Sequence, residues 1–165
     1  MRCSFGGAAD RYDRIRPSYP AEAVRWLLAP AGTGPLRVVD LGAGTGILTR
    51  VLLRLGHDVV AVEPDPDMRA TLVDSTPGVV PLPGSAESLP VADGSVDAVV
   101  AGQSYHWFDP DRAHPEIARV LRGGGVFGPI WNDRDERIAW LSELSRIADG
   151  LTARDGGAEP GPVDV

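Results

Sequence analysis

The sequence predicts an α/β fold in which one parallel β-sheet carries α-helices on both faces. Short apolar, β-branched segments alternate with amphipathic helical segments from residue 36 to residue 150. A glycine-rich turn joins the first of these strands directly to a helix, as is typical of parallel sheets that bind ligands. The 165 residues, of which 43% are hydrophobic, are sufficient for one packed domain.

The expected elements follow one another in regular order. We predict five strands, at residues 36–41, 59–62, 79–82, 95–101 and 126–131, and helices at residues 21–28, 46–55, 67–75, 110–121 and 136–150. The third strand is the weakest of these predictions because prolines flank it. Residues 1–150 form the predicted domain, with 1–34 as an N-terminal lid and helix region, and the Gly-, Pro- and Asp-rich residues 151–165 are expected to be disordered.

The turn after the first strand contains three alternating glycines, Gly42, Gly44 and Gly46. Glycines permit tight turns and let a ligand approach the main chain, and the helix that follows presents free N–H groups. A dinucleotide-binding turn has its third glycine at the position of Ile47, so the spacing here differs from it. Asp40 would crowd a pyrophosphate but suits an ammonium group, and both features argue against NAD.

Glu63 ends the predicted second strand. It follows the glycine turn by about the distance at which an acidic residue meets ribose hydroxyls in nucleoside-binding folds. Its two acceptor oxygens suit a vicinal diol, although a glutamate at a strand end can also be simply solvated. Together, Asp40, Glu63 and the absent third glycine favour an adenosyl ligand that carries an ammonium group.

Charge and composition argue against several classes of function. The formal net charge of −7 disfavours a general nucleic-acid binder. Cys3 is the only cysteine, so no internal disulfide can form, and no cluster of Cys and His has metal-ligand spacing. No apolar run approaches the length of a membrane span, and the N-terminus does not resemble a signal peptide. We expect a cytoplasmic protein with no metal and no nucleic-acid or membrane partner.

Several motifs occur in a fixed order along the chain. They are VVDLGAGTG at residues 38–46, GSAESLP at 84–90, DGSVDAV at 93–99, the aromatic and arginine-containing segment 5–20, and HWFD at 106–109. The first resembles motif I of class I S-adenosylmethionine-dependent methyltransferases, and the next two resemble the methyltransferase type 11 branch. The last two are similar to its trans-aconitate methyltransferase-like subgroup. The resemblance implies a Rossmann-like doubly wound sheet with strand order 3-2-1-4-5.

The resemblance also implies which residues hold S-adenosylmethionine. Asp40 would orient its ammonium group, and Glu63 would hold the ribose hydroxyls. Many relatives have Asp where this chain has Ser85, so the backbone of Ala86 is the expected contact to the adenine. The full set of implied cofactor residues is Tyr12, Arg16 and Tyr19 in an N-terminal lid, Asp40, Gly42, Ala43, Gly44 and Gly46 at the methionine part, Glu63 and Pro64 at the ribose, Ser85, Ala86 and Glu87 at the adenine, and Gln103 near the transferred methyl group.

Catalysis requires little beyond alignment, because methyl transfer is an in-line displacement with a neutral leaving group. If the acceptor must lose a proton, His106 is the best candidate base, since it follows the fourth strand and titrates near neutral pH. Alternatively, His106 only braces the loop beside Trp107. Tyr105, Trp107 and Phe108 would wall the acceptor pocket or pack in the core.

Members of this family usually continue past this length with a further helix and an antiparallel strand pair. Residues 152–165 cannot form those strands, so the fifth strand would be an exposed edge. We therefore expect a homodimer, formed through this edge or by exchange of elements.

The leading hypothesis is transfer of a methyl group to a small molecule, a carboxylate or a secondary metabolite, with S-adenosylhomocysteine as the product. One alternative is a truncated S-adenosylmethionine-binding or structural relic without turnover. Another is a methyltransferase fold repurposed for a cyclisation or rearrangement. An NAD-dependent oxidoreductase is the third, and Ile47 and Asp40 argue against it.

Overall fold

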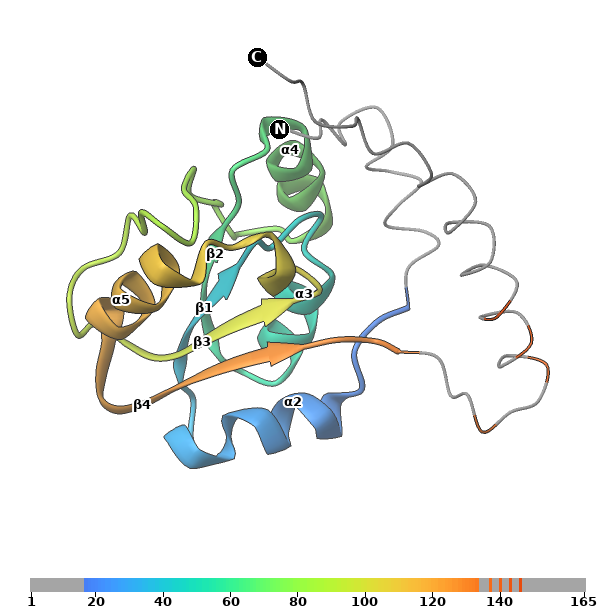
Figure 1. Cartoon of the computed structure of the whole chain (residues 1–165), viewed down its shortest axis with the longest axis horizontal. Coiled ribbons are helices and arrows are strands. Elements are labelled where there is room, and N and C mark those ends of the chain that lie inside the picture. Colours follow the sequence, from blue (N-terminus) through green and yellow to red (C-terminus); the bar gives the residue numbers. More distant parts are fainter. Residues whose placement is uncertain (1–16, 134–136, 138–139, 141–142, 144–145, 147–165) are drawn as a thin grey trace, which may run out of the picture. The chain divides into compact units, whose positions relative to one another are not determined.

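The computed structural model describes residues 17–133, 137, 140, 143 and 146. The chain divides into two units, residues 1–132 and 133–165. The elements of the first unit are, in chain order, α2 (Ala21–Leu28), the 3-10 helix η2 (Ala29–Ala31), β1 (Arg37–Leu41), α3 (Ile47–Arg54), β2 (Asp58–Val62), α4 (Pro66–Ser75), β3 (Val96–Gly102), the 3-10 helix η3 (Tyr105–Trp107), α5 (Pro110–Val120) and β4 (Leu121–Ile130) (Figure 1).

The strands form one four-stranded sheet in the order β2-β1-β3-β4, and each neighbouring pair is parallel. Asp40 in β1 is level with Ala61 in β2 and with Val100 in β3. The carboxyl ends of the strands therefore meet at one edge of the sheet, where open parallel sheets bind their ligands. The predicted α/β class with a parallel sheet is confirmed.

The predicted third strand at residues 79–82 is not found as a strand. Leu82 alone forms a parallel bridge to Val62 at the outer side of β2. Its N–H donates to the Ala61 carbonyl at 2.8 Å, and its carbonyl accepts from the Glu63 N–H at 3.1 Å. Pro81 and Pro83 fix φ near about −65°, whereas parallel strands need about −120°, so the pairing does not extend. The five-strand count and its order 3-2-1-4-5 are thus not confirmed.

The last strand begins earlier than the sequence pattern predicts. β4 starts at Leu121, directly after α5, instead of at residue 126. Leu121 pairs with Val96, and the next pair is Ala98 with Val126, so the glycine run between them bulges out of the ladder. Gly124 has φ +83° there, a conformation that favours glycine. β4 lies at one edge of this sheet, and the homodimer expected through that edge stays a prediction.

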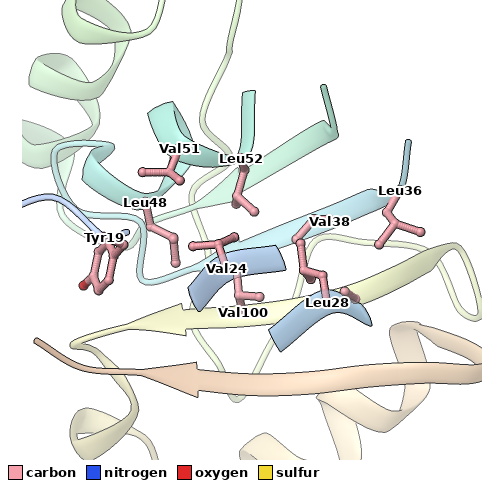
Figure 2. Packing of buried hydrophobic residues seen from close by; sticks show 10 residues of the cluster. Tyr19, Val24, Leu28, Leu36, Val38, Leu48, Val51, Leu52 and Val100 are labelled. Carbon is pink, nitrogen blue, oxygen red and sulfur yellow. The ribbon is translucent and has the colours of Figure 1, made fainter. Parts of the chain in front are cut away.

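Two hydrophobic clusters cover the two faces of the sheet. β1 shows the alternation, because Val38 points to the first cluster and Val39 to the second. Figure 2 shows the first cluster, in which side chains of α2 and α3 meet those of the sheet. The second cluster places α5 against the other face, through residues such as Ile117. The predicted helices on both faces are therefore confirmed.

Acidic caps set the start of two helices at the edge where the strands end. Asp65 accepts hydrogen bonds from the N–H groups of Asp67 and Met68, at 2.9 and 3.1 Å, and α4 begins directly after it. Asp109 caps α5 in the same way. Pro66 and Pro110 occupy the first helical position, where no N–H is needed. These caps start each helix within one residue of the prediction.

The second unit is described only at isolated residues. Trp140, Glu143 and Arg146 are helical, and Glu143 forms an ion pair with Arg146. Arg137, inside the predicted helix 136–150, lies in a turn, and the remaining residues of that helix and of the predicted disordered tail lie outside the described residues, as do residues 1–16. Among the described residues, no helix combines the length and the apolar character that a membrane crossing needs.

Candidate functional site

The glycine turn adopts a conformation that only glycine supports well. Gly42, Gly44 and Gly46 all have positive φ, at +68°, +57° and +86°. A Cβ on Gly42 would lie 2.7 Å from the Cβ of Ser104, so a side chain there would also clash. A Cβ on Gly44 would meet nothing within 4 Å. The turn is thus packed against Ser104 at Gly42, whereas the space where a Gly44 side chain would lie is open.

A small open pocket lies beside this turn. It is bounded on one side by the glycine turn and on the other by the ends of β3 and β4 and the segment before α2. The described lining residues are Pro17, Tyr19, Asp40, Gly42, Ala43, Gly44, Thr45, Ile47, Leu48, Gly102, Gln103 and Asn132.

Asp40 is the buried charge of the pocket. It is 1% exposed, and its Oδ2 accepts a 2.6 Å hydrogen bond from the Thr49 hydroxyl on α3. Its Oδ1 is buried without a hydrogen-bond partner in the described part of the chain. Burial, and to a lesser degree the nearby charge of Glu63, raises the pKa of Asp40 to about 7. A cation next to Oδ1 would supply the missing hydrogen-bond donor and would favour the ionised form of Asp40.

Glu63 holds the glycine turn from the end of β2. Its Oε2 accepts the Gly44 N–H at 2.8 Å, and its Oε1 accepts the Asp65 N–H at 2.9 Å. Arg69 donates to the Glu63 carbonyl at 2.7 Å. Burial raises the pKa of the Glu63 carboxyl, although the two backbone hydrogen bonds oppose the rise. Glu63 is therefore not a merely solvated residue at a strand end.

The wall opposite the glycine turn is built from three residues distant in sequence. Gln103, directly after β3, donates from Nε2 to the Asn132 carbonyl at 3.0 Å. Asn132 donates from Nδ2 to the Pro17 carbonyl at 3.1 Å. All three residues line the pocket. Asn132 and Pro17 have no part in the sequence-based prediction of the site.

The residues predicted for the adenine lie outside this pocket. Ala86 is 3% exposed and packs in the cluster on the α5 face of the sheet. Glu87 accepts the Asp109 N–H at 3.0 Å. Burial by itself would raise the pKa of Glu87, but hydrogen bonds from the Asp109 N–H and the Ser85 hydroxyl lower it. In this arrangement Glu87 positions the start of α5.

His106 lies apart from the pocket. It is exposed in η3, and its ring centroid is 4.8 Å from that of Trp107, which is itself 66% exposed. Tyr105 instead packs inward, and its hydroxyl is 2.9 Å from Nε2 of His114. Its ring also contacts aromatic neighbours, which are Phe108, Phe127 and Trp131. The role of His106 as a base stays a prediction, and no described pocket contact supports it.

A family comparison identifies the fold around this pocket. Residues 39–128 match the model of a family described as methyltransferase domain. The chain belongs to this family. The matched segment includes Asp40, the glycine turn, Glu63 and Gln103.

Individual relatives of this methyltransferase domain agree with the assignment. A Mycobacterium tuberculosis methyltransferase described only as uncharacterized is 52% identical over 98% of this chain and 66% of its own length. A malonyl-[acyl-carrier protein] O-methyltransferase of Pectobacterium atrosepticum is 36% identical over 89% of this chain and 58% of its own. This chain therefore spans between about half and two thirds of these relatives.

A solved structure shows the same fold. The SAM-dependent methyltransferase of Thermotoga maritima superposes with a TM-score of 0.62 at 28% identity, over 88% of this chain and 68% of the other. The predicted resemblance to SAM-dependent methyltransferases is confirmed by these matches.

The structure gathers only part of the predicted cofactor residues in the pocket. Those that line it are Tyr19, Asp40, Gly42, Ala43, Gly44 and Gln103. Those that lie beside or outside it are Gly46, Glu63, Pro64, Ser85, Ala86 and Glu87. Tyr12 and Arg16 lie outside the described residues. Within the described part of the chain, no group of three or more His, Cys, Asp or Glu side chains is placed to hold a metal ion.

Sequence reasoning missed several lining residues, which are Pro17, Thr45, Ile47, Leu48, Gly102 and Asn132. One signal for Asn132 was available, because it directly follows the last strand and therefore lies at the ligand-binding edge of the sheet. Pro17 lies in the predicted lid segment beside Arg16, but its own contact to Asn132, 115 residues away along the chain, has no local sequence signal.

Proposed function

We propose that this protein uses S-adenosylmethionine to methylate a carboxylate on a small or carrier-bound acyl molecule. The observation that carries the cofactor assignment is the buried Oδ1 of Asp40 at the glycine turn, which has no partner among the described residues. An α-ammonium group supplies the missing donor and compensates the buried charge. The residues present thus fit the amino-acid half of this methyl donor.

The remaining residues fit the other requirements of the donor. Gly44 is open toward the pocket, which permits close approach of a ligand to the main chain. The Glu63 carboxylate lies directly after the neighbouring strand β2; each of its oxygens accepts one backbone N–H and has a further lone pair that suits a ribose hydroxyl. When bound, S-adenosylmethionine supplies an electrophilic methyl carbon on a positively charged sulfur. The protein's task is to orient that carbon toward the acceptor and to exclude water.

A carboxylate acceptor is supported by the composition of the described pocket lining. That lining includes no histidine, lysine or cysteine, and its two ionisable side chains are engaged elsewhere, because Asp40 is assigned to the ammonium group and Tyr19 packs in the hydrophobic core. A carboxylate, with an ordinary pKa near about 4, is already ionised at neutral pH and attacks without losing a proton. The malonyl group named for the Pectobacterium relative carries such a free carboxylate.

Calorimetric titration with S-adenosylhomocysteine and with NAD tests the cofactor assignment. We expect S-adenosylhomocysteine to bind and NAD to give no heat. Binding of NAD in place of S-adenosylhomocysteine would overturn the assignment, and binding of neither would favour a relic without a cofactor.

The acceptor class is tested with methyl-labelled S-adenosylmethionine and two matched acyl thioesters. A malonyl thioester carries a free carboxylate and an acetyl thioester does not. We expect label only in the malonyl compound, released as methanol by mild alkali as an ester requires. Label that survives alkali, or equal labelling of both thioesters, contradicts a carboxylate acceptor.

A further inference from the structure

A hydrogen-bonded chain crosses the pocket wall that faces the glycine turn. The Gln103 side-chain amide donates to the Asn132 carbonyl at 3.0 Å, and the Asn132 side-chain amide donates to the Pro17 carbonyl at 3.1 Å. The chain links the end of β3, the end of β4 and the segment that enters α2. All three of its residues line the pocket.

Gln103 is held in a strained conformation at the centre of this wall. Its φ is +60°, and it is the only described residue other than glycine with a positive φ. The strain is maintained from both sides, because its backbone N–H donates to the Ile130 carbonyl at 2.9 Å and its side chain donates to Asn132. Backbone strain of this kind persists where the surroundings fix it, typically at functional sites.

The segment before α2 is attached at two points. Tyr19 is 7% exposed and packs in the first hydrophobic cluster, where Figure 2 shows it beside Leu48. Its hydroxyl oxygen lies 2.8 Å from the position that a Cβ on Gly102 would occupy. Two residues earlier, the Asn132 side chain holds the Pro17 carbonyl. Tyr19 therefore anchors the segment in the core, and the hydrogen bond from Asn132 sets where Pro17 meets the pocket.

We propose that Asn132 is a positioning residue for the amino-acid half of the methyl donor. Through its side-chain donor to Pro17 and its carbonyl acceptor for Gln103, it holds the wall opposite Asp40 and the glycine turn in its binding shape. The inference rests on the proposed function, because the same pocket contains the unpartnered Oδ1 of Asp40 that suits an ammonium group.

The variant Asn132→Asp tests this role. It keeps the size of the side chain and the carbonyl that accepts from Gln103, but it replaces the donor to Pro17 with a carboxylate oxygen. We measure affinity for two ligands that share the thioadenosine part, S-adenosylhomocysteine and 5′-methylthioadenosine, of which only the first carries the amino acid. We expect the Kd of S-adenosylhomocysteine to rise on the order of tenfold, as for a lost polar contact, and that of methylthioadenosine to stay within about twofold.

Two further variants support the reading. Asn132→Ala removes the same hydrogen bond without adding a charge, so it replaces the Asp variant if that variant does not fold. We expect about a fivefold loss of affinity for S-adenosylhomocysteine and none for methylthioadenosine. Ser95→Ala is the matched control. It removes a hydrogen bond from a side chain to a backbone carbonyl, Ser95 Oγ to Ala92 at 2.7 Å, just before the amino end of β3 and away from the pocket. It should leave both affinities unchanged.

The outcomes separate the inference from the function on which it rests. Failure of the wild-type protein to bind S-adenosylhomocysteine overturns the proposed function. Wild-type binding with unchanged affinity in both Asn132 variants overturns the positioning role alone. Equal losses for both ligands also overturn it, because they indicate a general disturbance of the fold and not of the amino-acid half.

Discussion

Two acidic side chains of this molecule are held in opposite ways. Asp40 in the pocket has one buried oxygen that no group of the described chain partners, and burial raises the pKa of Asp40 to about 7. Glu116 on α5 has both oxygens occupied by Arg119, at 2.8 Å each, and one of them also accepts the Leu89 N–H at 2.9 Å. These hydrogen bonds lower the pKa of Glu116 to about 2.

The region around Glu116 is complete without a ligand, whereas the pocket around Asp40 is not. Arg119 also donates to Asp93 at 2.6 Å and to the carbonyls of Leu89 and Val91, at 3.0 and 2.9 Å. The connection before β3 is thereby fastened to α5, and the polar groups there satisfy one another. The pocket instead leaves a buried acceptor unsatisfied, which a fold tolerates where a ligand supplies the donor. The following predictions, ordered by their expected effect on cofactor affinity, test this contrast.

The largest effect is expected from Asp40→Asn. It removes the negative charge but keeps the shape, so affinity for S-adenosylhomocysteine should fall on the order of 100-fold, as expected for a charged hydrogen bond. Affinity for methylthioadenosine, which lacks the ammonium group, should change little. Asp58→Asn, the same substitution at the exposed amino end of β2, is the control. Equal affinity in the Asp40 and Asp58 variants would remove the basis for the cofactor assignment.

Glu63→Ala should weaken the binding of both ligands, although by less than Asp40→Asn weakens the binding of S-adenosylhomocysteine. Loss of both Glu63 oxygens releases the Gly44 and Asp65 N–H groups and removes the acceptors for the ribose. Calorimetry should show roughly tenfold weaker binding of both S-adenosylhomocysteine and methylthioadenosine. Unchanged affinity for methylthioadenosine would refute the ribose role, because that ligand retains the ribose.

The affinity for S-adenosylhomocysteine should rise by up to roughly tenfold between pH 6 and pH 8. Because the pKa of Asp40 is raised to about 7, its ionised fraction increases from pH 6 to pH 8, and affinity for the cationic ammonium group should increase with it. The Asp40→Asn variant should show a flat profile over this range. An equal slope in both proteins would assign the dependence to another group.

The stability of the wild-type protein should change with pH in the opposite direction, beginning at lower pH. A carboxyl whose pKa is raised on folding contributes stability below its ordinary pKa and loses it as the pH rises through the raised value. The wild-type protein should therefore lose stability relative to Asp40→Asn between about pH 4 and pH 7 in chemical denaturation.

Arg119→Gln should have almost no effect on affinity. It breaks the contacts to Glu116, Asp93 and two carbonyls, so the melting temperature should fall by several degrees. Binding of S-adenosylhomocysteine should stay within about twofold of wild type at a temperature where both proteins are folded. A large loss of affinity would show that this region and the pocket are not independent.

Much of the fold could be predicted because its signals are local. The helix at residues 21–28 matches α2, and the strand that leads into the glycine turn differs from β1 by one residue. The prediction of a third strand at residues 79–82 was wrong, because the two prolines that flank Leu82 restrict the backbone in a way that the apolar pattern does not show. The predicted start of the last strand was too late, because Leu121 pairs with Val96 across a bulge in the glycine run, and such a pairing depends on the neighbouring strand β3.

The sequence alone predicts one side of the site, because Asp40, the glycine turn and Glu63 follow one another at spacings that favour an adenosyl ligand with an ammonium group. The other side of the site comes from the fold. The tertiary structure brings Asn132 to Pro17, turns Glu63 onto the Gly44 N–H and leaves His106 exposed outside the pocket. The physical reason is that a turn and its flanking residues are fixed by short-range backbone geometry, whereas the opposite wall exists only once parallel strands have aligned their carboxyl ends.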